Sequence, residues 1–179
     1  MNTPFPHFRY HPDSLSTGSI KAADDVCLCC NQARGYVYTA SCYTAHDLPE
    51  EKFCPWCIAD GSAAARYDMY FADGHPLLCA GVAGNIVDEV CERTPGYVSW
   101  QQEHWLACCD DACAFAGDAS RKELIELGAE ALSAQFTDFS WPLEAWKNLI
   151  EYYQPGGETA LYRFECLHCQ KVHYGIDFA

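Results

Sequence analysis

Thirteen of the 179 residues are cysteines, and the spacing of eight of them is typical of metal ligands. They form four close pairs along the chain: Cys27/Cys30, Cys54/Cys57, Cys109/Cys113 and Cys166/Cys169. A tight turn with two residues between its cysteines holds both thiolates on one side, where backbone N–H groups can stabilise their charge. Zinc binds four such ligands in a tetrahedron, so one turn supplies half a site. The sequence therefore predicts two Zn²⁺ sites of four cysteines each.

The first predicted site joins Cys27 and Cys30 to a second pair, Cys54 and Cys57, across 23 intervening residues. Residues that favour strands lie between the two pairs, and a helical pattern opens at the second pair. This order is the layout of a treble-clef or zinc-ribbon finger, and the positive end of the helix dipole would favour thiolates. One alternative stays open, because Cys29 is close enough to replace a ligand of the first pair.

The second predicted site takes its ligands from two segments that are 52 residues apart: Cys109, Cys113, Cys166 and Cys169. The first two of these cysteines would share a face if a helix began at Asp110. Zinc would then clamp the C-terminal strands onto the middle of the chain. Two replacements stay open, because Cys108 and His168 adjoin these ligands and could take the place of one of them.

The cysteines outside these pairs are expected to be small core residues: Cys29, Cys42, Cys79, Cys91 and Cys108. Cys79 follows His75 by four residues, which is a nucleophile-and-base combination, but the sequence does not fix their geometry. A disulfide framework is the weaker interpretation of thirteen cysteines, because their number is odd. The first ten residues also contain two prolines and no apolar core of a signal peptide, which indicates a cytoplasmic protein.

The charge balance limits the kinds of partner. The chain has 11 Lys and Arg against 25 Asp and Glu, for a formal net charge of −14. Affinity for nucleic acids and for anionic membranes depends on Lys and Arg, so this balance argues against both as partners. Two zinc ions, each bound by four thiolates, would add −2 apiece and bring the charge to about −18. A protein partner is therefore expected to be basic.

Short elements would position the cysteines, and the expected fold class is α+β. Strands are expected at 36–43, 97–108, 161–165 and 171–178, and helices at 58–71, 85–92, 120–135 and 141–153. A capping box of Ser120 and Glu123 opens the third helix, and Ser140 is expected to cap the fourth. Small antiparallel strands and hairpins would gather around treble-clef or zinc-ribbon cysteine knuckles, with several short helices packed on them.

The length fits a single domain over residues 1–179. Its sub-regions would be 20–75, with the first zinc finger, and 95–179, with the second zinc site and a helical insertion. The longest mildly apolar stretch, 76–87, is too short to span a bilayer.

The sequence contains few signs of catalysis. Its seven histidines form no zinc-protease or deaminase pattern, and there is no glycine-rich phosphate loop. A binding role is therefore favoured over an enzymatic one. The alternative function is a zinc-dependent hydrolase that uses an open metal position, or a pocket near His7, His11 and His104.

Four segments carry a resemblance to a known family. They are Phe8-Arg-Tyr-His-Pro-Asp13 with Thr17-Gly-Ser19; Cys27-Leu-Cys-Cys30 with Gln32-Ala-Arg-Gly-Tyr36; Cys54-Pro-Trp-Cys-Ile-Ala-Asp-Gly-Ser62; and Arg93-Thr-Pro-Gly-Tyr97 through Trp100-Gln101 to Cys113-Ala-Phe115. With Cys166-Leu-His-Cys169 they extend over nearly the whole chain. They resemble the CbrC-like family, whose named member is described as a colicin tolerance protein.

This resemblance implies a zinc-binding bacterial protein of the cytoplasm that blunts the effect of a toxin. It brings no established catalytic residues to this chain. Nuclease toxin domains tend to be basic, and their immunity partners are often strongly acidic, which speeds association. The resemblance and the charge together favour an immunity or tolerance factor that binds a basic toxin domain.

Overall fold

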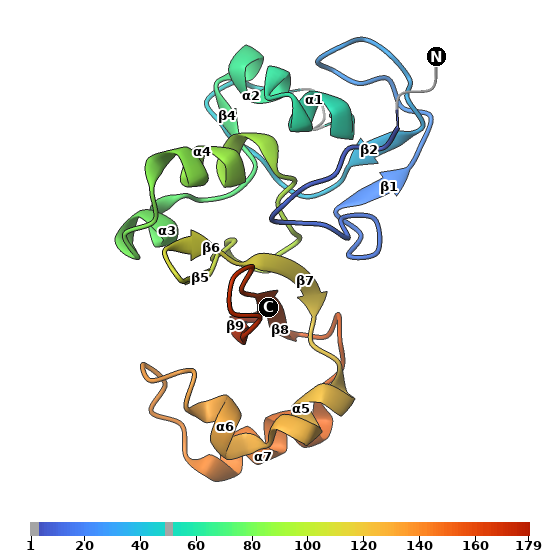
Figure 1. Ribbon diagram of the computed structural model, residues 1–179. Helices are drawn as coiled ribbons and strands as arrows, with labels where there is room; N and C mark the ends of the chain where they lie inside the picture. The colour runs from blue at the N-terminus through green and yellow to red at the C-terminus, as the bar shows by residue number, and fades with distance from the viewer. Residues whose placement is uncertain (1–3, 49–51) are drawn as a thin grey trace.

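The computed structural model describes residues 4–48 and 52–179, which form a mixed α+β fold of short elements (Figure 1). Within those ranges the strands make four antiparallel sheets, three of two strands and one of three. The N-terminal elements lie at the top of Figure 1, the three-stranded sheet in the middle and three helices at the bottom. The predicted fold class is confirmed, including the small strand pairs and the two clusters of cysteines.

The N-terminal part has two antiparallel strand pairs and two short helices that lie, in sequence, between the strands of the second pair. Its elements are β1 (Ile20–Ala22), β2 (Tyr36–Tyr38), β3 (Tyr43–Thr44), α1 (Pro55–Ala59), α2 (Ser62–Tyr67) and β4 (Met69–Tyr70). The single helix predicted over 58–71 is wrong, because Gly61 adopts a left-handed φ of 75° between α1 and α2. Asp68, with a φ of 45°, ends α2 and turns the chain into β4. A core that includes Phe53, Ile58 and Phe71 holds these elements together.

The central part joins two helices to five strands. These are α3 (His75–Cys79), α4 (Gly84–Arg93), β5 (Ala107–Cys108), β6 (Asp111–Ala112), β7 (Ala114–Asp118), β8 (Thr159–Glu165) and β9 (Val172–Phe178), with β8 between β7 and β9. The strands predicted over 97–108 are mostly wrong, because only the last two residues pair. The segment instead buries Tyr97 and Trp105, and Tyr97 stacks on Phe115 with ring centroids 4.2 Å apart. Aromatic packing, rather than sheet pairing, sets the path of this segment.

Three helices cover one face of the three-stranded sheet: α5 (Arg121–Leu127), α6 (Ala129–Ser133) and α7 (Leu143–Tyr152). The predicted capping box is present at the start of α5. The helix predicted over 120–135 is divided, because Gly128 takes a φ of 82° between α5 and α6. The last helix begins after Pro142 and lacks the predicted Ser140 cap. Trp146, 1% exposed, belongs to the cluster that joins these helices to Tyr174 of the sheet.

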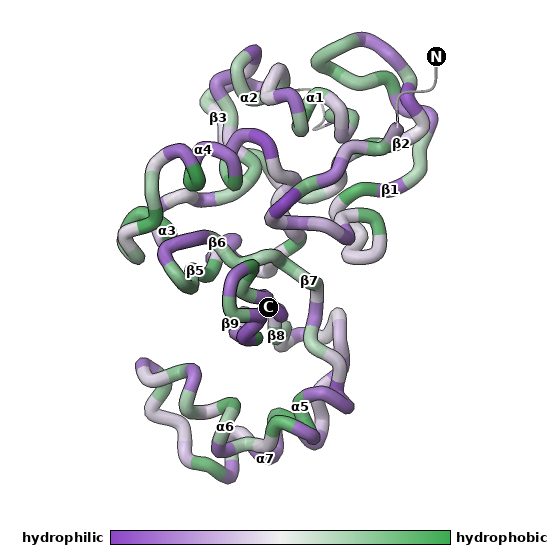
Figure 2. Tube along the Cα trace, viewed as in Figure 1, coloured by the Kyte–Doolittle hydropathy of each residue, from purple (hydrophilic) through white to green (hydrophobic). Residues whose placement is uncertain are grey.

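Hydrophobic and hydrophilic residues are interspersed along the elements (Figure 2). Among the helices formed by residues 4–48 and 52–179, none has both the length and the apolar character needed to cross a bilayer.

Glu103 is a buried carboxylic acid in the segment between Tyr97 and Trp105, and it is only 3% exposed. Burial raises the pKa of Glu103 above its ordinary value of 4.5, although a hydrogen bond from the hydroxyl of Tyr43 acts in the opposite direction. The nearby carboxylates of Asp73 and Asp177 also raise it. The folded protein therefore holds this proton more tightly than the unfolded chain. The stability that comes from this tighter proton binding is fully present below the ordinary pKa of 4.5. It is lost as the pH rises through the pKa of Glu103 in the folded protein.

We expect Glu103→Gln to raise the melting temperature at pH 8, because glutamine still accepts the hydrogen bond of Tyr43 and carries no charge. The gain over the parent protein should disappear as the pH is lowered from 8 to the ordinary value of 4.5, and thermal unfolding at several pH values measures it. Glu151→Gln, at an exposed position of α7, removes the same charge without desolvation and should leave the melting temperature unchanged. A parent protein as stable as Glu103→Gln at pH 8 would contradict this account.

Candidate metal centres

The fold brings the first predicted set of four cysteines together. The sulfur atoms of Cys27, Cys30, Cys54 and Cys57 all lie within 4.8 Å of one another. The distance between the Sγ atoms of Cys30 and Cys54 is 3.9 Å. Four sulfurs placed about 2.3 Å from one zinc ion would be separated by about 3.8 Å along the edges of a tetrahedron. These four side chains therefore fit a single tetrahedral metal ion, and we call them the first cysteine group.

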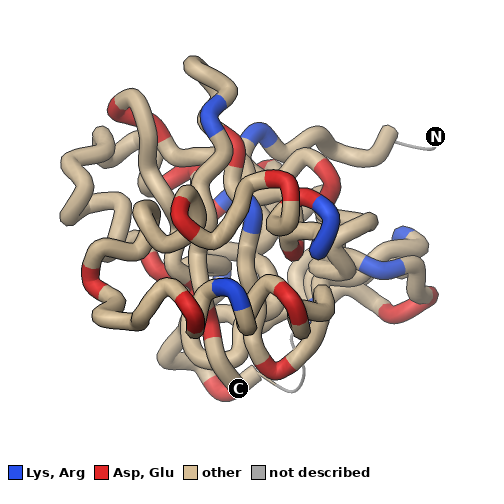
Figure 3. The backbone as a smooth tube through the Cα atoms, turned by 90° about the horizontal axis from the view of Figure 1, so that it is seen from below, with Lys and Arg blue, Asp and Glu red and all other residues tan. Residues whose placement is uncertain are grey.

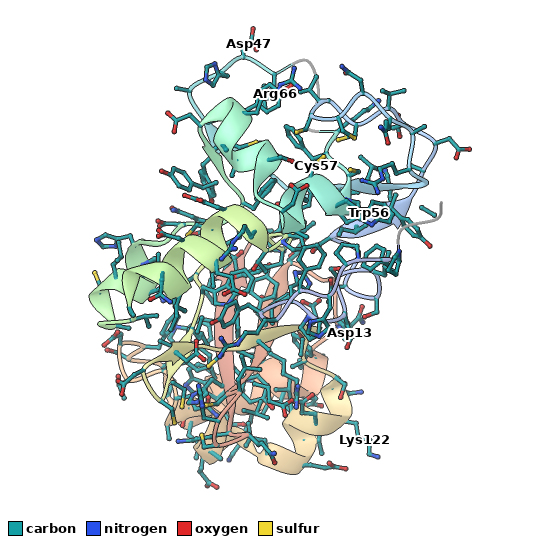
Figure 4. All side chains as sticks on the ribbon, turned by 45° about the horizontal axis from the view of Figure 1, so that its top comes forward. Asp13, Asp47, Trp56, Cys57, Arg66 and Lys122 are labelled. Atoms are coloured by element: carbon teal, nitrogen blue, oxygen red, sulfur yellow. The ribbon has the colours of Figure 1, made fainter. Side chains whose placement is uncertain are left out.

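Two backbone turns place the first cysteine group. In the first turn, the N–H of Asn31 donates to the carbonyl of Cys27 at 2.8 Å, and Asn31 takes a left-handed φ of 55°. In the second turn, Cys54 is the N-cap residue of α1 and Pro55 takes the first helical position, which suits its fixed φ. One helical turn later, Cys57 faces the same centre, and Figure 4 shows it on α1 next to Trp56.

The electrostatics of the first cysteine group favour a cation at its centre. The backbone N–H of Cys54 donates to Sγ of Cys27 at 3.2 Å. A hydrogen bond from the side chain of Cys54 is the main cause that lowers the pKa of Cys27 to about 4. Once Cys27 is a thiolate, its contact raises the pKa of Cys54, and burial raises the pKa of Cys57 to about 12. Cys27 thus gives up its proton readily, whereas Cys54 and Cys57 hold theirs until a bound cation compensates the charge.

A second cysteine group forms where two hairpins meet. Its sulfur atoms also lie within 4.8 Å of one another, and they belong to Cys108, Cys109, Cys166 and Cys169. Sγ of Cys108 lies 3.8 Å from Sγ of Cys109 and 3.8 Å from Sγ of Cys169, which again matches the edges of a zinc tetrahedron. The backbone N–H of Cys169 donates to Sγ of Cys166 and lowers the pKa of that thiol to about 6. The second cysteine group therefore also fits a metal ion.

The second cysteine group differs from the predicted set at one position. Cys113 is fully buried in the central core, where its carbonyl accepts the indole N–H of Trp105 at 2.8 Å. Its Sγ is not among the four that lie within 4.8 Å of one another. The prediction assumed a helix from Asp110, but Cys108 pairs with Asp111 across β5 and β6, which leaves a two-residue hairpin loop. Both loop residues have left-handed φ values, as this tight turn requires.

Cys108 takes the place that the prediction gave to Cys113. It is the last residue of β5, and the turn that follows brings Cys109 beside it. The sequence left this replacement open. The run Cys108-Cys-Asp-Asp111 contained the signal for it, because Asp tolerates the left-handed conformation of a hairpin loop better than most residues.

Asp111 connects the second cysteine group to the N-terminal segment. It is 3% exposed and accepts hydrogen bonds from Nη2 of Arg9 at 2.6 Å, the hydroxyl of Tyr10 at 2.8 Å and Nε2 of His168 at 2.8 Å. Burial acts to raise the pKa of Asp111, but these three partners together hold it below its usual range. His168 lies in the turn between Cys166 and Cys169, so one carboxylate fixes both halves of the group.

We expect Asp111→Asn to retain the second metal but to release it to a chelator about tenfold faster, because outer partners hold metal ligands in position. Release can be followed by the absorbance of a coloured chelator. His168→Asn should have a smaller effect in the same direction, because Arg9 and Tyr10 still hold Asp111. Unchanged release from Asp111→Asn would show that the network does not support the group.

The other candidate residues lie elsewhere. Cys29 is buried, and its thiol donates to Oγ of Ser62 at 3.6 Å rather than joining the first cysteine group. Sγ of Cys79 lies 3.5 Å from Nε2 of His75, and both residues are exposed. The neighbouring carboxylate of Asp73 binds the backbone N–H of His75, so it does not orient the ring for catalysis.

The histidines of the alternative hydrolase do not form a site together with either cysteine group. His7 and His104 are exposed, whereas His11 is fully buried with both ring nitrogens bonded, to the carbonyl of Pro95 and to Oγ1 of Thr17. Burial lowers the pKa of His11 to about 4. Among the described residues, the only groups of three or more close metal-ligating side chains are the two cysteine groups.

Comparisons of the sequence with known proteins show the family of this chain. A UPF0167 protein of Pseudomonas aeruginosa is 62% identical over 178 residues, which is 99% of each chain. UPF0167 proteins of Mycobacterium bovis and Mycobacterium tuberculosis are each 41% identical over 177 residues, 97% of this chain and 94% of theirs. No solved structure matches the chain significantly. Residues 5–178 match the family described as "Uncharacterised protein family (UPF0167)", and the chain belongs to this family.

Proposed function

We propose that this protein is a binding protein whose fold is held by two structural zinc ions. The observation that supports the proposal is the makeup of the two cysteine groups, because each brings four thiols to one point. A zinc ion with four cysteine ligands has no open position for water or substrate, which is the arrangement of structural sites and not of catalytic ones. Zinc bound there would tie α1 to the N-terminal turn and the β8–β9 hairpin to the β5–β6 hairpin.

Metal analysis of the intact protein, purified under reducing conditions, tests this proposal. We expect two zinc ions per chain, and cobalt substitution should give the absorption of four thiolates around each ion. Iron would also suit four tetrahedral thiolates, and elemental analysis distinguishes it from zinc. Fewer than two metals, or a cobalt spectrum with fewer thiolates and a bound water, would contradict closed structural sites. Such a result would favour the alternative function, a zinc-dependent hydrolase.

The partner that fits this chain best is a basic protein domain. Several of its few cations are occupied within the fold: Arg9 binds Asp111, Arg163 binds Glu123, and the guanidinium of Arg34 lies over the ring of Trp56. Figure 3 shows Asp and Glu spread over the described part of the chain, with Lys and Arg between them, and the sequence has 25 of the former against 11 of the latter. With two zinc sites the net charge would be about −18, which favours rapid association with a positively charged partner.

We further propose that the family is the CbrC-like one that the sequence resembles and that the protein acts in the cytoplasm as an immunity or tolerance factor against a basic nuclease toxin. The acidic composition and the quoted motifs support this proposal. We expect the metal-loaded protein to bind such a toxin domain, to lower its nuclease activity, and to bind more weakly at 300 mM salt than at 50 mM. A panel of basic nuclease toxin domains that neither bind nor lose activity would contradict the immunity role.

A further inference from the structure

A hollow of about 500 Å³ lies between the β3–β4 strand pair and helices α3 and α4. Figure 1 shows these helices together on one side of the molecule. None of the eight cysteines of the two groups lines the hollow, so it is separate from the candidate metal centres.

Two tyrosines form one wall of the hollow. Tyr43 and Tyr70 are directly opposite each other in the β3–β4 pair, so their side chains project from the same face. Both rings keep contact with solvent, with exposed fractions of 36% and 46%. The face of an aromatic ring carries negative potential and attracts cations.

Two carboxylates line the hollow as well. Asp73 is fixed by the backbone N–H of His75 at 2.9 Å and by Nε2 of Gln102 at 2.7 Å, whereas Asp88 is an exposed residue of α4. A smaller hollow of about 250 Å³ shares Asp73 and is also lined by Glu103 and Asp177, so acidic side chains continue beyond the first hollow. Among the described residues that line either hollow there is no Lys or Arg.

Apolar groups line the rest of the hollow. Leu78 and Val87 contribute aliphatic side chains. The thiol of Cys91, 4% exposed, also faces it and makes no hydrogen bond within residues 4–48 and 52–179. The hollow therefore combines an uncharged apolar surface with acidic and aromatic walls, and this combination suits a cation that carries a hydrocarbon chain.

We propose that this hollow binds an alkylammonium group, with the charge between Asp73, Asp88 and the tyrosine rings and the carbon chain against Leu78. An alkylammonium group occurs both in the lysine side chain of a protein and in a free polyamine. The proposal does not depend on the metal centres or on a toxin partner, because it rests on the walls of the hollow alone.

Calorimetric titration of the metal-loaded protein at 150 mM salt tests the proposal, with spermidine and Nα-acetyl-lysine-N′-methylamide as separate probes. We expect one-to-one binding, weakened about tenfold in Asp88→Asn and about fivefold in Tyr70→Leu. Glu151→Gln removes the same charge from α7 and should bind as the parent does. The norleucine analogue of the lysine probe has the carbon chain without the charge and should not bind.

The outcomes separate the two sources. Tighter binding of spermidine supports a free polyamine, tighter binding of the lysine probe supports a protein side chain, and equal binding supports the shared ammonium chemistry. The proposal is overturned if neither probe binds, or if Glu151→Gln weakens binding as much as Asp88→Asn does. Any of these results can occur with two zinc ions bound, so failure here does not affect the proposed structural role of the metals.

Discussion

In Cys54→Ser we expect the first metal to be lost and the free energy of unfolding to fall by more than about 4 kcal/mol. The variant would leave Cys27 and Cys57 buried beside one another without a cation to compensate their charge. Serine is a preferred N-cap residue, so the start of α1 should not itself be weakened by the change. The loss of stability therefore reports on the metal, and guanidinium unfolding together with metal analysis measures both quantities.

Cys79→Ser is the matched control, because Cys79 is exposed and lies outside both cysteine groups. It should keep two metals and the parent stability to within about 0.5 kcal/mol. If Cys54→Ser kept two metals and the parent unfolding midpoint, the first cysteine group would not be a metal site.

Cys108→Ser should lower the metal content, whereas Cys113→Ala should leave it unchanged. Cys108→Ser removes a sulfur of the second cysteine group, so we expect one metal in place of two and half of the cobalt–thiolate absorbance. Cys113→Ala removes a buried thiol from the core, so both metals should stay while the free energy of unfolding falls by about 1 kcal/mol.

This pair of variants tests the ligand set directly, because either cysteine could have completed the second group according to the sequence. Loss of a metal from Cys113→Ala, together with retention of both in Cys108→Ser, would favour the set predicted from the spacing alone. The same metal analysis of Cys166→Ser should resemble that of Cys108→Ser, since both sulfurs belong to one group.

The spacing of the cysteines predicted much of the candidate metal centres. Three pairs with two residues between their cysteines lie where the structure brings four sulfurs together, because such a turn fixes its own geometry over four residues. The α+β class followed in the same way from local patterns, and the capping box of α5 is a local pattern too.

The parts that the sequence did not reveal depend on contacts between distant residues. The choice of Cys108 over Cys113 depends on a two-residue hairpin and on the packing of Trp105, and neither follows from spacing. Two predicted helices were too long, because their ranges include Gly61 and Gly128, and both residues adopt positive φ values between two shorter helices.

The hydrogen bond between Tyr10 and Asp111 joins residues that are 101 positions apart, and Asp111 also contacts His168 close to the end of the chain. A ribosome releases these three segments at different times. All four cysteines of the first group have emerged with residue 57, whereas the second group gains its last sulfur only with Cys169. A growing chain therefore exposes the unpaired Cys108 and Cys109 through the synthesis of more than fifty further residues. During synthesis the first cysteine group can therefore bind a metal ion before the second group is complete, and Asp111 becomes available to Tyr10 only late, although Tyr10 is made early.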